Sequence, residues 1–127
     1  MKKQILVYNL SDAQISALRV QLKPLGCTVR KVIEKEYSLP IGALAGLNGF
    51  VYKKTAKPSQ LIRTSFAVIC GYSGFALDAV TAAFDRGGVS GVVKAVLTET
   101  NAQWDSITLY NEVMREHNYM QNKNRPD

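Results

Sequence analysis

Two short apolar runs organise the hydrophobic pattern of the chain. One lies within residues 4–9 and has Ile5 to Tyr8 at its centre, and the other covers residues 66–70. Neither run alternates between apolar and polar positions, which is typical of strands that are buried on both faces of a sheet. The pattern therefore predicts two central strands, one in each half of the chain.

Each central strand is followed by the pattern of a capped amphipathic helix. Ser11 and Gln14 predict a capping box for the first helix, and Ser73 is the expected cap of the second. When the first half is shifted along the sequence until Ser11 meets Ser73, other positions of the two halves align as well. These further pairs are Ile15 with Leu77, Leu18 with Val80, Leu22 with Phe84, and Gly26 with Gly88. The chain therefore resembles two related strand-helix-strand halves.

Two outer strands complete the halves. One is predicted at 27–33, where Arg30 and Lys31 interrupt the apolar run as in an edge strand, and the other at 92–98. Lys94, inside the second of these, is interpreted as a structural lysine whose stem is buried.

The remaining segments are less regular. A short helix is predicted at 40–47, a long connection at 48–63, and a final helix at 102–117. The expected buried side of the final helix carries Trp104, Ile107, Tyr110, Val113 and Met114.

Two architectures fit this order of elements. The favoured fold class is a small doubly wound α/β domain with a mainly parallel four-stranded sheet, strand order 2-1-3-4, and helices on both faces. The alternative is a ferredoxin-like α+β fold, in which the two halves interlock in an antiparallel sheet with the helices on one face. The continuous apolar strands favour the first, because one face of a ferredoxin-like sheet is normally in contact with water.

The length of 127 residues is that of one domain, so residues 1–127 are expected to form a single α/β unit with a polar, frayed tail at 118–127. The composition indicates neither disorder nor a membrane span. The N-terminal apolar run has no cleavage-like site after it. With two cysteines and no export signal, the sequence predicts a cytoplasmic protein with reduced thiols.

The positive charge of the chain raises the possibility of nucleic-acid binding. The formal charge is +6, and no Asp or Glu occurs from Tyr37 to Leu77. The cations of the central loop in this window are Lys53, Lys54, Lys57 and Arg63. A basic loop attracts phosphates, but no nucleic-acid motif accompanies these residues. A nucleic-acid-associated role of loop 53–63 is therefore the alternative function and not the favoured one.

Known catalytic motifs are absent from the sequence. Two distant cysteines and one histidine do not make a zinc site, and residues 71–74 have neither the spacing nor the lysine of a phosphate-binding loop. Cys70 and His117 are predicted to lie too far apart for a nucleophile and its base. The sequence predicts no catalytic residue, no metal and no cofactor, which argues against an enzyme.

Polar and small residues follow three of the predicted strands. In a parallel sheet they converge at the carboxyl edge, where helix N-termini present free backbone donors to a carboxylate or phosphate. The candidate ligand-binding residues are Asn9, Ser11, Gly71, Ser73, Gly74, Thr98, Thr100 and Asn101. A structural interpretation of the same residues is that they cap helices, with Thr100 and Gln103 forming a capping box. The shared rim requires the first and third strands to run in the same direction.

The last third of the chain carries its most specific motif. Residues 93–104 read V-K-A-V-L-T-E-T-N-A-Q-W and are followed by Leu109, Glu112 and the pair Glu116-His117. Together with segments 40–46 and 70–73, this motif resembles the small bacterial family catalogued as domain of unknown function 3783. The resemblance implies a stand-alone bacterial cytoplasmic domain, and it brings neither an assigned activity nor catalytic residues.

The function that the sequence favours is a non-catalytic binding or regulatory module. Its expected partner is a small anionic ligand or a protein, held at the carboxyl edge of the sheet.

Overall fold

The computed structural model describes residues 2–52 and 57–123, with residues 121–123 described as backbone only. Within these residues, one sheet contains β1 (Gln4–Tyr8), β2 (Thr28–Lys31), β3 (Phe66–Cys70) and β4 (Val93–Val96) in the order β2-β1-β3-β4. The predicted strand order is confirmed. Every residue of β1 and β3 is buried, as expected for the two central strands.

The strand directions differ from the prediction. β1 pairs with β2 in parallel and β3 pairs with β4 in parallel, but β1 and β3 are antiparallel. The sheet is therefore mixed and not mainly parallel, because its central pair runs in opposite directions.

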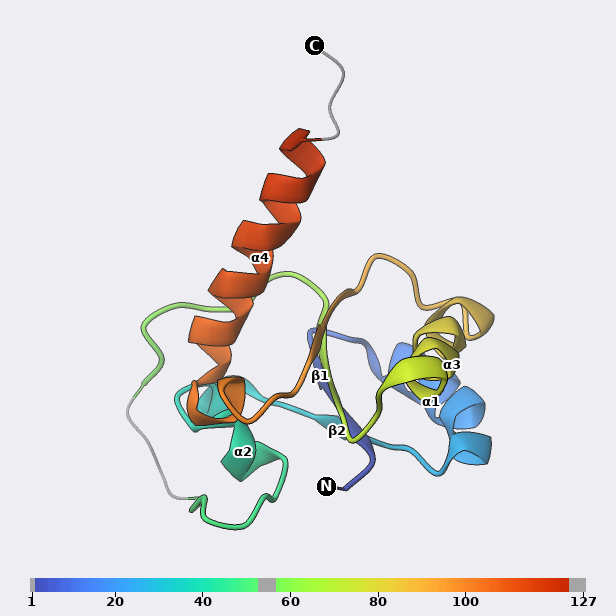
Figure 1. Ribbon diagram of the computed structural model, residues 1–127, viewed down its shortest axis with the longest axis horizontal. Coiled ribbons are helices and arrows are strands. Elements are labelled where there is room, and N and C mark those ends of the chain that lie inside the picture. The colour runs from blue at the N-terminus through green and yellow to red at the C-terminus, as the bar shows by residue number, and fades with distance from the viewer. Residues whose placement is uncertain (1, 53–56, 124–127) are drawn as a thin grey trace.

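Helices cover both faces of the sheet, as predicted (Figure 1). On one face, α1 (Asp12–Leu22) and α3 (Gly74–Arg86) contact each other. On the other face lie α2 (Ile41–Leu44) and the long α4 (Ser106–Lys123). Three short 3-10 turns connect these elements, namely η1 (Lys23–Leu25), η2 (Glu34–Glu36) and η3 (Asn101–Gln103).

The placement of α1 and α3 on one face follows from the antiparallel centre. Parallel strand-helix-strand units are almost always right-handed. Rotating one such unit by 180° about an axis perpendicular to the sheet reverses the direction of its strands but keeps its helix on the same face. A doubly wound sheet places these two helices on opposite faces, so this part of the favoured fold is wrong. The ferredoxin-like alternative anticipated the antiparallel centre, but the two halves lie side by side and do not interlock.

The two halves are structural repeats. β1 begins at position 4 and β3 at position 66, and α1 begins at position 12 and α3 at position 74. Both offsets equal the shift that aligns Ser11 with Ser73 in the sequence. In the central register Leu6 pairs with Val68, its own equivalent under this shift, and on either side Gln4 pairs with Cys70 and Tyr8 with Phe66. The halves are therefore related by a pseudo-two-fold axis that passes between Leu6 and Val68.

The same hydrogen bonds end the first helix of each half. The Cys27 N–H donates to the Leu22 carbonyl at 3.2 Å, and the Val89 N–H donates to the Phe84 carbonyl at 2.8 Å. The glycines that precede them, Gly26 and Gly88, have φ values of 66° and 71°. These are left-handed conformations that glycine adopts at little cost, which explains the two glycines that the sequence aligned.

Each face of the sheet has its own hydrophobic core. On the α1 and α3 side, alternate residues of the central strands such as Ile5 and Ile69 pack against both helices. On the other side, the rings of Tyr8 and Phe66 lie 5.2 Å apart, and Ile107 and Leu109 of α4 pack against the same cluster. The sheet is thus covered on both faces, as its apolar central strands predicted.

The final helix is displaced from its predicted range. α4 begins at Ser106, where the prediction gave 102, and it continues to Lys123. Residues 118–123 are helical, so the predicted frayed tail is wrong over this range, and residues 124–127 lie outside the described part. A short helix forms within the predicted range 40–47, but α2 ends at Leu44 and is shorter than predicted; its Ile41 and Leu44 are buried.

Among residues 2–52 and 57–123, no helix has both the length and the apolar composition needed to cross a membrane.

Candidate functional site

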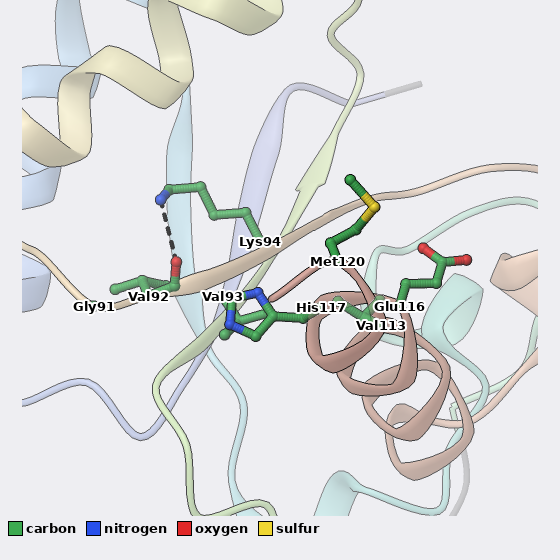
Figure 2. A pocket seen from close by; sticks show the side chains of 8 residues that line it. All are labelled: Gly91, Val92, Val93, Lys94, Val113, Glu116, His117 and Met120. Atoms are coloured by element: carbon green, nitrogen blue, oxygen red, sulfur yellow. Dashed lines mark hydrogen bonds between the residues drawn. The ribbon is translucent and has the colours of Figure 1, made fainter. Parts of the chain in front are cut away.

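A groove separates the edge strand β4 from α4 (Figure 2). Its first hollow, of about 510 Å³, lies at the start of β4. The residues that line it are Gly91, Val92, Val93 and Lys94 from the strand segment and Val113, Glu116, His117 and Met120 from α4. A second hollow, of about 330 Å³, continues along the strand past Val96 and shares Lys94, Val113 and Glu116 with the first. We call the two hollows together the β4–α4 groove.

The groove exists because, among the α4 side chains that the structure describes, only those of the first half pack on the sheet. Ile107 and Leu109 are buried in the core, and Val113 is the last of these described side chains that packs against it. Glu116, His117 and Met120 then follow on the same side of the helix, facing the start of β4 (Figure 2). The helix has moved past the sheet at this point, so an open space is left between the two elements.

β4 presents backbone groups along this open edge. The N–H groups of Val93 and Leu97 donate to carbonyls of the β3 segment, at 3.0 and 2.9 Å. Because alternate residues of a strand direct their backbone groups to opposite sides, those of Lys94 and Val96 are directed toward the open edge. Side chains cover part of it: Lys94 Nζ donates to the Val92 carbonyl at 3.2 Å, and Asn101 Nδ2 donates to the Val96 carbonyl at 3.0 Å.

The cation of Lys94 is used within the fold. Its Nζ lies 4.8 Å from the centre of the Phe84 ring, in addition to its bond with the Val92 carbonyl. Figure 2 shows the side chain extended away from α4. The interpretation of Lys94 as a structural lysine is consistent with these contacts.

The end of α4 carries large exposed apolar side chains. Tyr119 is 64% exposed and Met120 is 52% exposed. A shallow hollow of about 370 Å³ lies between them and the stems of Arg115 and Glu116. In Figure 1 this part of α4 extends beyond the rest of the molecule. We call residues 113–120 the projecting end of α4.

The predicted shared rim does not form. Because β1 and β3 are antiparallel, Asn9 and Ser11 follow β1 at one end of the sheet, whereas Gly71, Ser73 and Gly74 follow β3 at the other. Thr98, Thr100 and Asn101 follow β4, which is parallel to β3, so they share the end of Gly71. The structure therefore divides the eight residues into two separate groups.

The side chains of the first group, Asn9 and Ser11, make hydrogen bonds with backbone groups. Asn9 has a φ of 60°, and its Nδ2 donates to the carbonyls of Ile62 and Thr64, the second at 3.1 Å. Ser11 caps α1 through the predicted capping box, with its Oγ accepting from the Gln14 N–H at 3.1 Å. Both side chains thus act as structural groups in this conformation.

The second group is also engaged locally. Gly71 has a φ of 86°, and a Cβ at this position would lie 3.0 Å from the Lys2 carbonyl oxygen. Ser73 occupies the N-cap position of α3, but its side chain makes no capping hydrogen bond there. Gly74 is the first residue of α3 and has a φ of 56°. This turn is therefore shaped by backbone conformation and not by side-chain caps.

Thr98 and Asn101 pair with each other across the turn after β4. The Asn101 N–H donates to Thr98 Oγ1 at 3.1 Å, and the Thr98 N–H donates to Asn101 Oδ1 at 2.8 Å. Thr100 makes no side-chain cap of the following turn η3, so the capping box predicted for Thr100 and Gln103 does not form.

Another hollow, of about 610 Å³, lies at the carboxyl ends of β1 and β2. It brings Asn9 from the first group together with Lys31 and Arg63. Lys31 Nζ also lies 3.5 Å from Asp12 Oδ1 in an exposed ion pair. Glu34 lines the same hollow, so the site carries both signs of charge.

The basic loop proposed for nucleic acid is described only in part. Lys53 and Lys54 lie outside the described residues. Lys57 and Arg63 are exposed, and Arg63 belongs to the hollow beside β1. No common surface of the four cations is defined by the described residues.

Neither cysteine is bridged or activated. Cys27 and Cys70 are free and belong to the cores on opposite faces of the sheet. Burial, with a smaller contribution from Cys27, raises the pKa of Cys70 to about 12, and burial also raises the pKa of Cys27. Such thiols stay protonated and are poor nucleophiles. Within the described residues, no three His, Cys, Asp or Glu side chains gather in a way that would hold a metal ion.

The groove residues were not assigned to a site from the sequence. A sequence signal for the groove is the apolar side of the final helix, which continues at a spacing of seven residues from Val113 to Met120, beyond the predicted end at 117. The sequence prediction places Tyr119 and Met120 in the polar tail.

Residues 65–120 match the family model described as Domain of unknown function (DUF3783). This match confirms, over that range, the family that the sequence motif resembles. It extends from the residue before β3 into the projecting end of α4 and so includes both walls of the β4–α4 groove. No curated protein and no solved structure was found to match the chain.

Proposed function

We propose that this protein is a non-catalytic binding module that holds a protein partner along the β4–α4 groove and the projecting end of α4. The observation that carries this proposal is the exposure of Tyr119 and Met120 on a helix that continues past its own core. Exposed apolar side chains of this size, gathered beside an open groove, are typical of surfaces that another protein covers.

The groove suits a macromolecule better than a small ligand. Pockets for small molecules bury most of the ligand surface, whereas this groove is open along the edge of β4. Its other features are backbone groups at a sheet edge and apolar side chains along a helix, which are the two elements that peptide and protein partners most often engage. The charges of Glu112 and Arg115, which form an ion pair at 3.0 Å, fit the polar rim of such a surface.

A second candidate function is supported by the hollow beside β1 and β2. Lys31 and Arg63 line it together with Asn9, and two cations beside one hollow suit a small anionic ligand. A thermal-shift titration with inorganic phosphate and with nucleotides tests this function. We expect a rise in melting temperature that is lost in Arg63→Gln and kept in the control Lys57→Gln. The same rise in both variants would instead indicate non-specific charge attraction.

Photo-crosslinking tests the favoured function. A photoreactive amino acid, p-benzoylphenylalanine, replaces Tyr119 at the projecting end or, as the control, Val20 on α1, whose side chain is 69% exposed. We expect a discrete crosslinked species from position 119 and not from position 20. Adding Met120→Glu to the first variant should abolish this species, because a carboxylate resists burial in an apolar contact.

Two results would contradict the proposal. One is equal crosslinking from positions 119 and 20, which indicates random encounters. The other is a species at 119 that persists with Met120→Glu, which indicates that the apolar end of the helix is not the contact.

A further inference from the structure

We propose that the partner binds as an extended segment of basic sequence, which pairs with the free edge of β4 and directs lysine or arginine side chains into the β4–α4 groove. The inference rests on the function proposed above, because it names the kind of segment that the same groove holds. It is argued from the backbone groups of β4, from the charge of the surrounding segment and from the spacing of two glutamates on α4.

The edge of β4 offers backbone groups that the fold does not use. The N–H and C=O groups of Lys94 and the N–H group of Val96 are directed away from β3. Within residues 2–52 and 57–123, none of these groups makes a hydrogen bond. The neighbouring carbonyls of Val92 and Val96 accept from the side chains of Lys94 and Asn101 instead. A strand of another chain can pair with the groups that are left, as in other cases of strand addition at a sheet edge.

The groove gives such a strand a helix to pack against. The hollow at the start of β4 contains His117 and Met120, and the hollow that continues past Val96 contains Leu109, so α4 runs antiparallel to β4 along the groove. An added strand lies about 4.8 Å from β4 and continues the sheet. Every second side chain of that strand is directed to the face of the sheet on which α4 lies, and so into the two hollows (Figure 2).

The groove lies in the acidic part of a basic chain. Residues 95–116 contain four acidic residues and one basic residue, so their formal charge is −3, whereas the whole chain has +6. These charged residues are Glu99, Asp105, Glu112, Arg115 and Glu116. Glu112 and Glu116 line the groove, and the side chain of Lys94 extends away from α4 (Figure 2). The groove therefore attracts a basic segment and repels the phosphates of a nucleic acid.

The spacing of the two glutamates matches that of a strand. Glu112 and Glu116 lie four residues apart on α4, so their Cβ atoms are about 6 Å apart. Side chains two residues apart on a strand are separated by about 7 Å. Two alternate basic side chains of the partner can thus each meet one glutamate. The ion pair of Glu112 with Arg115, at 3.0 Å, is exposed and therefore weak enough to be exchanged.

The other edge strand, β2, does not offer the same site. Arg30 and Lys31 make that edge basic, and the Arg19 guanidinium donates to the Val29 carbonyl at 3.2 Å. The helix that follows β2 is α2, which has four residues, whereas α4 has 18. A basic strand is therefore expected at β4 and not at β2.

Fluorescence polarisation of a labelled peptide with the full chain tests the proposal. The probe is fluorescein-V-R-V-R-V-R-V-amide, whose arginines share one face of a strand. At about 50 mM salt we expect a dissociation constant on the order of 100 μM or tighter. The control R-R-V-V-V-R-V has the same composition without alternate arginines and should bind at least about 5-fold more weakly. No binding of the probe, or equal binding of the two peptides, would overturn the proposal.

Substitutions on α4 test the charge contacts. Glu112→Gln and Glu116→Gln should each weaken binding of the probe by about 5-fold, because each removes one carboxylate that faces an arginine. The matched control is Glu99→Gln, which removes the same charge at an exposed position that lines neither hollow, and it should leave the affinity unchanged. Circular dichroism establishes that the three variants remain folded. Equal weakening by all three would show general charge attraction alone and would contradict the proposed site.

Methylation of the peptide nitrogens tests strand pairing itself. In an added strand, alternate N–H groups point to β4 and the others point to solvent. Methylating the central valine nitrogens in one probe and the central arginine nitrogens in another should therefore weaken binding by more than about 10-fold in one case and by less than about 3-fold in the other. Loss with the valine set indicates an antiparallel strand, and loss with the arginine set a parallel one. Equal effects of the two sets would rule out pairing with β4.

The crosslinking experiment at position 119 separates this inference from the function on which it rests. A species that is lost with Met120→Glu, found for a chain that does not bind the probe, keeps the binding module and overturns the added strand. Probe binding that depends on Glu116, without any crosslink at 119, keeps the strand site and contradicts the role of the projecting end. A crosslinked species of twice the chain mass would identify a second copy as the occupant and overturn the basic segment.

Discussion

Both halves of the chain begin with the same strand-helix-strand unit, and they differ in the elements that follow its second strand. Strand, helix and strand follow each other in the same order in both, with a pseudo-two-fold axis between Leu6 and Val68. After the second strand, the first half continues into η2 and α2, and the second into η3 and α4. The two continuations meet on the same face of the sheet, where Pro40 bridges Asp105. The difference between them is therefore one of helix length.

Local sequence explains why α2 is short. Gly42 is a weak helix former, and a Cβ at this position would lie 2.6 Å from the ring of Phe50, so a larger residue there requires that ring to shift. Gly46, with a φ of 72°, then turns the chain away soon after the last helical residue. α4 contains neither glycine nor proline between Ser106 and Lys123. The repeated frame thus sets the core, and departure from the repeat creates the exposed surface.

The largest expected effect tests whether the halves fold as one unit. Leu22 and Phe84 are equivalent positions, and both are fully buried. We expect Leu22→Ala to lower the free energy of unfolding by about 3 kcal/mol and Phe84→Ala by about 4 kcal/mol. Urea unfolding should show one transition in each variant, by circular dichroism and by the fluorescence of the single Trp104.

Val20→Ala, at an exposed position, is the control for these core substitutions and should change stability by less than about 0.5 kcal/mol. Two separated transitions in Phe84→Ala would show that the first half is stable without the second. The repeats would then be independent units.

A second prediction concerns pH. Tyr8 and its equivalent Cys70 are both buried, and burial raises the pKa of each, that of Cys70 to about 12. Above the ordinary thiol pKa near 9, the unfolded chain loses this proton while the folded chain keeps it. The free energy of unfolding should therefore fall by about 1.4 kcal/mol per pH unit for Cys70 between about pH 9 and pH 12.

Tyr8 adds a loss that begins above its ordinary pKa of 10.0. Urea unfolding at pH 8 and pH 10.5 measures these losses together with those of other groups whose pKa burial raises, such as Cys27 and Tyr72. In Cys70→Ala the decrease between the two pH values should be smaller by about 2 kcal/mol. An equal decrease in both proteins would mean that the thiol ionises as readily in the folded state as in the unfolded one.

The equivalent glycines give a smaller effect. Gly26 and Gly88 both have positive φ, and a Cβ would meet no atom within 4 Å at either position. Gly26→Ala and Gly88→Ala should therefore each cost about 1 kcal/mol from backbone strain alone. Thermal unfolding of the two variants makes the comparison, with Ala17→Gly inside α1 as a helix control of similar size. Costs that differ by more than about twofold would show that the two turns are not energetically equivalent.

Much of the fold could be predicted from local pattern. The strand at 66–70 is correct to the residue, and the capping box at Ser11 is present. The strand order also follows, because continuous apolar runs report burial on both faces. The relative direction of the two central strands does not follow from these signals, since a continuous apolar run looks the same whichever way the strand runs in the sheet. The internal repeat does not give the direction either, because two equal units joined through the same strand are related by a two-fold axis in both cases. An axis along the strands keeps that pair parallel, as in a doubly wound sheet, and an axis perpendicular to the sheet makes it antiparallel.

The candidate site was harder to predict than the fold. The predicted ligand-binding rim required β1 and β3 to run in the same direction. Because they are antiparallel, its residues lie at two opposite ends of the sheet. Tyr119 and Met120 lie among polar residues, and nothing local distinguishes an exposed helix end from a frayed tail. Their exposure is a property of tertiary structure, since it arises because the sheet ends near Val113.

The smallest effect compares the two helix caps. Ser11 Oγ accepts the Gln14 N–H at 3.1 Å, whereas Ser73, its equivalent, makes no side-chain capping bond. Ser11→Ala should therefore cost about 1 kcal/mol, and Ser73→Ala should change the free energy of unfolding by less than about 0.3 kcal/mol. Urea unfolding of both variants under one buffer condition resolves this difference. Equal costs would mean that Ser73 caps α3 in solution, and the two halves would then be more alike than their hydrogen bonds indicate.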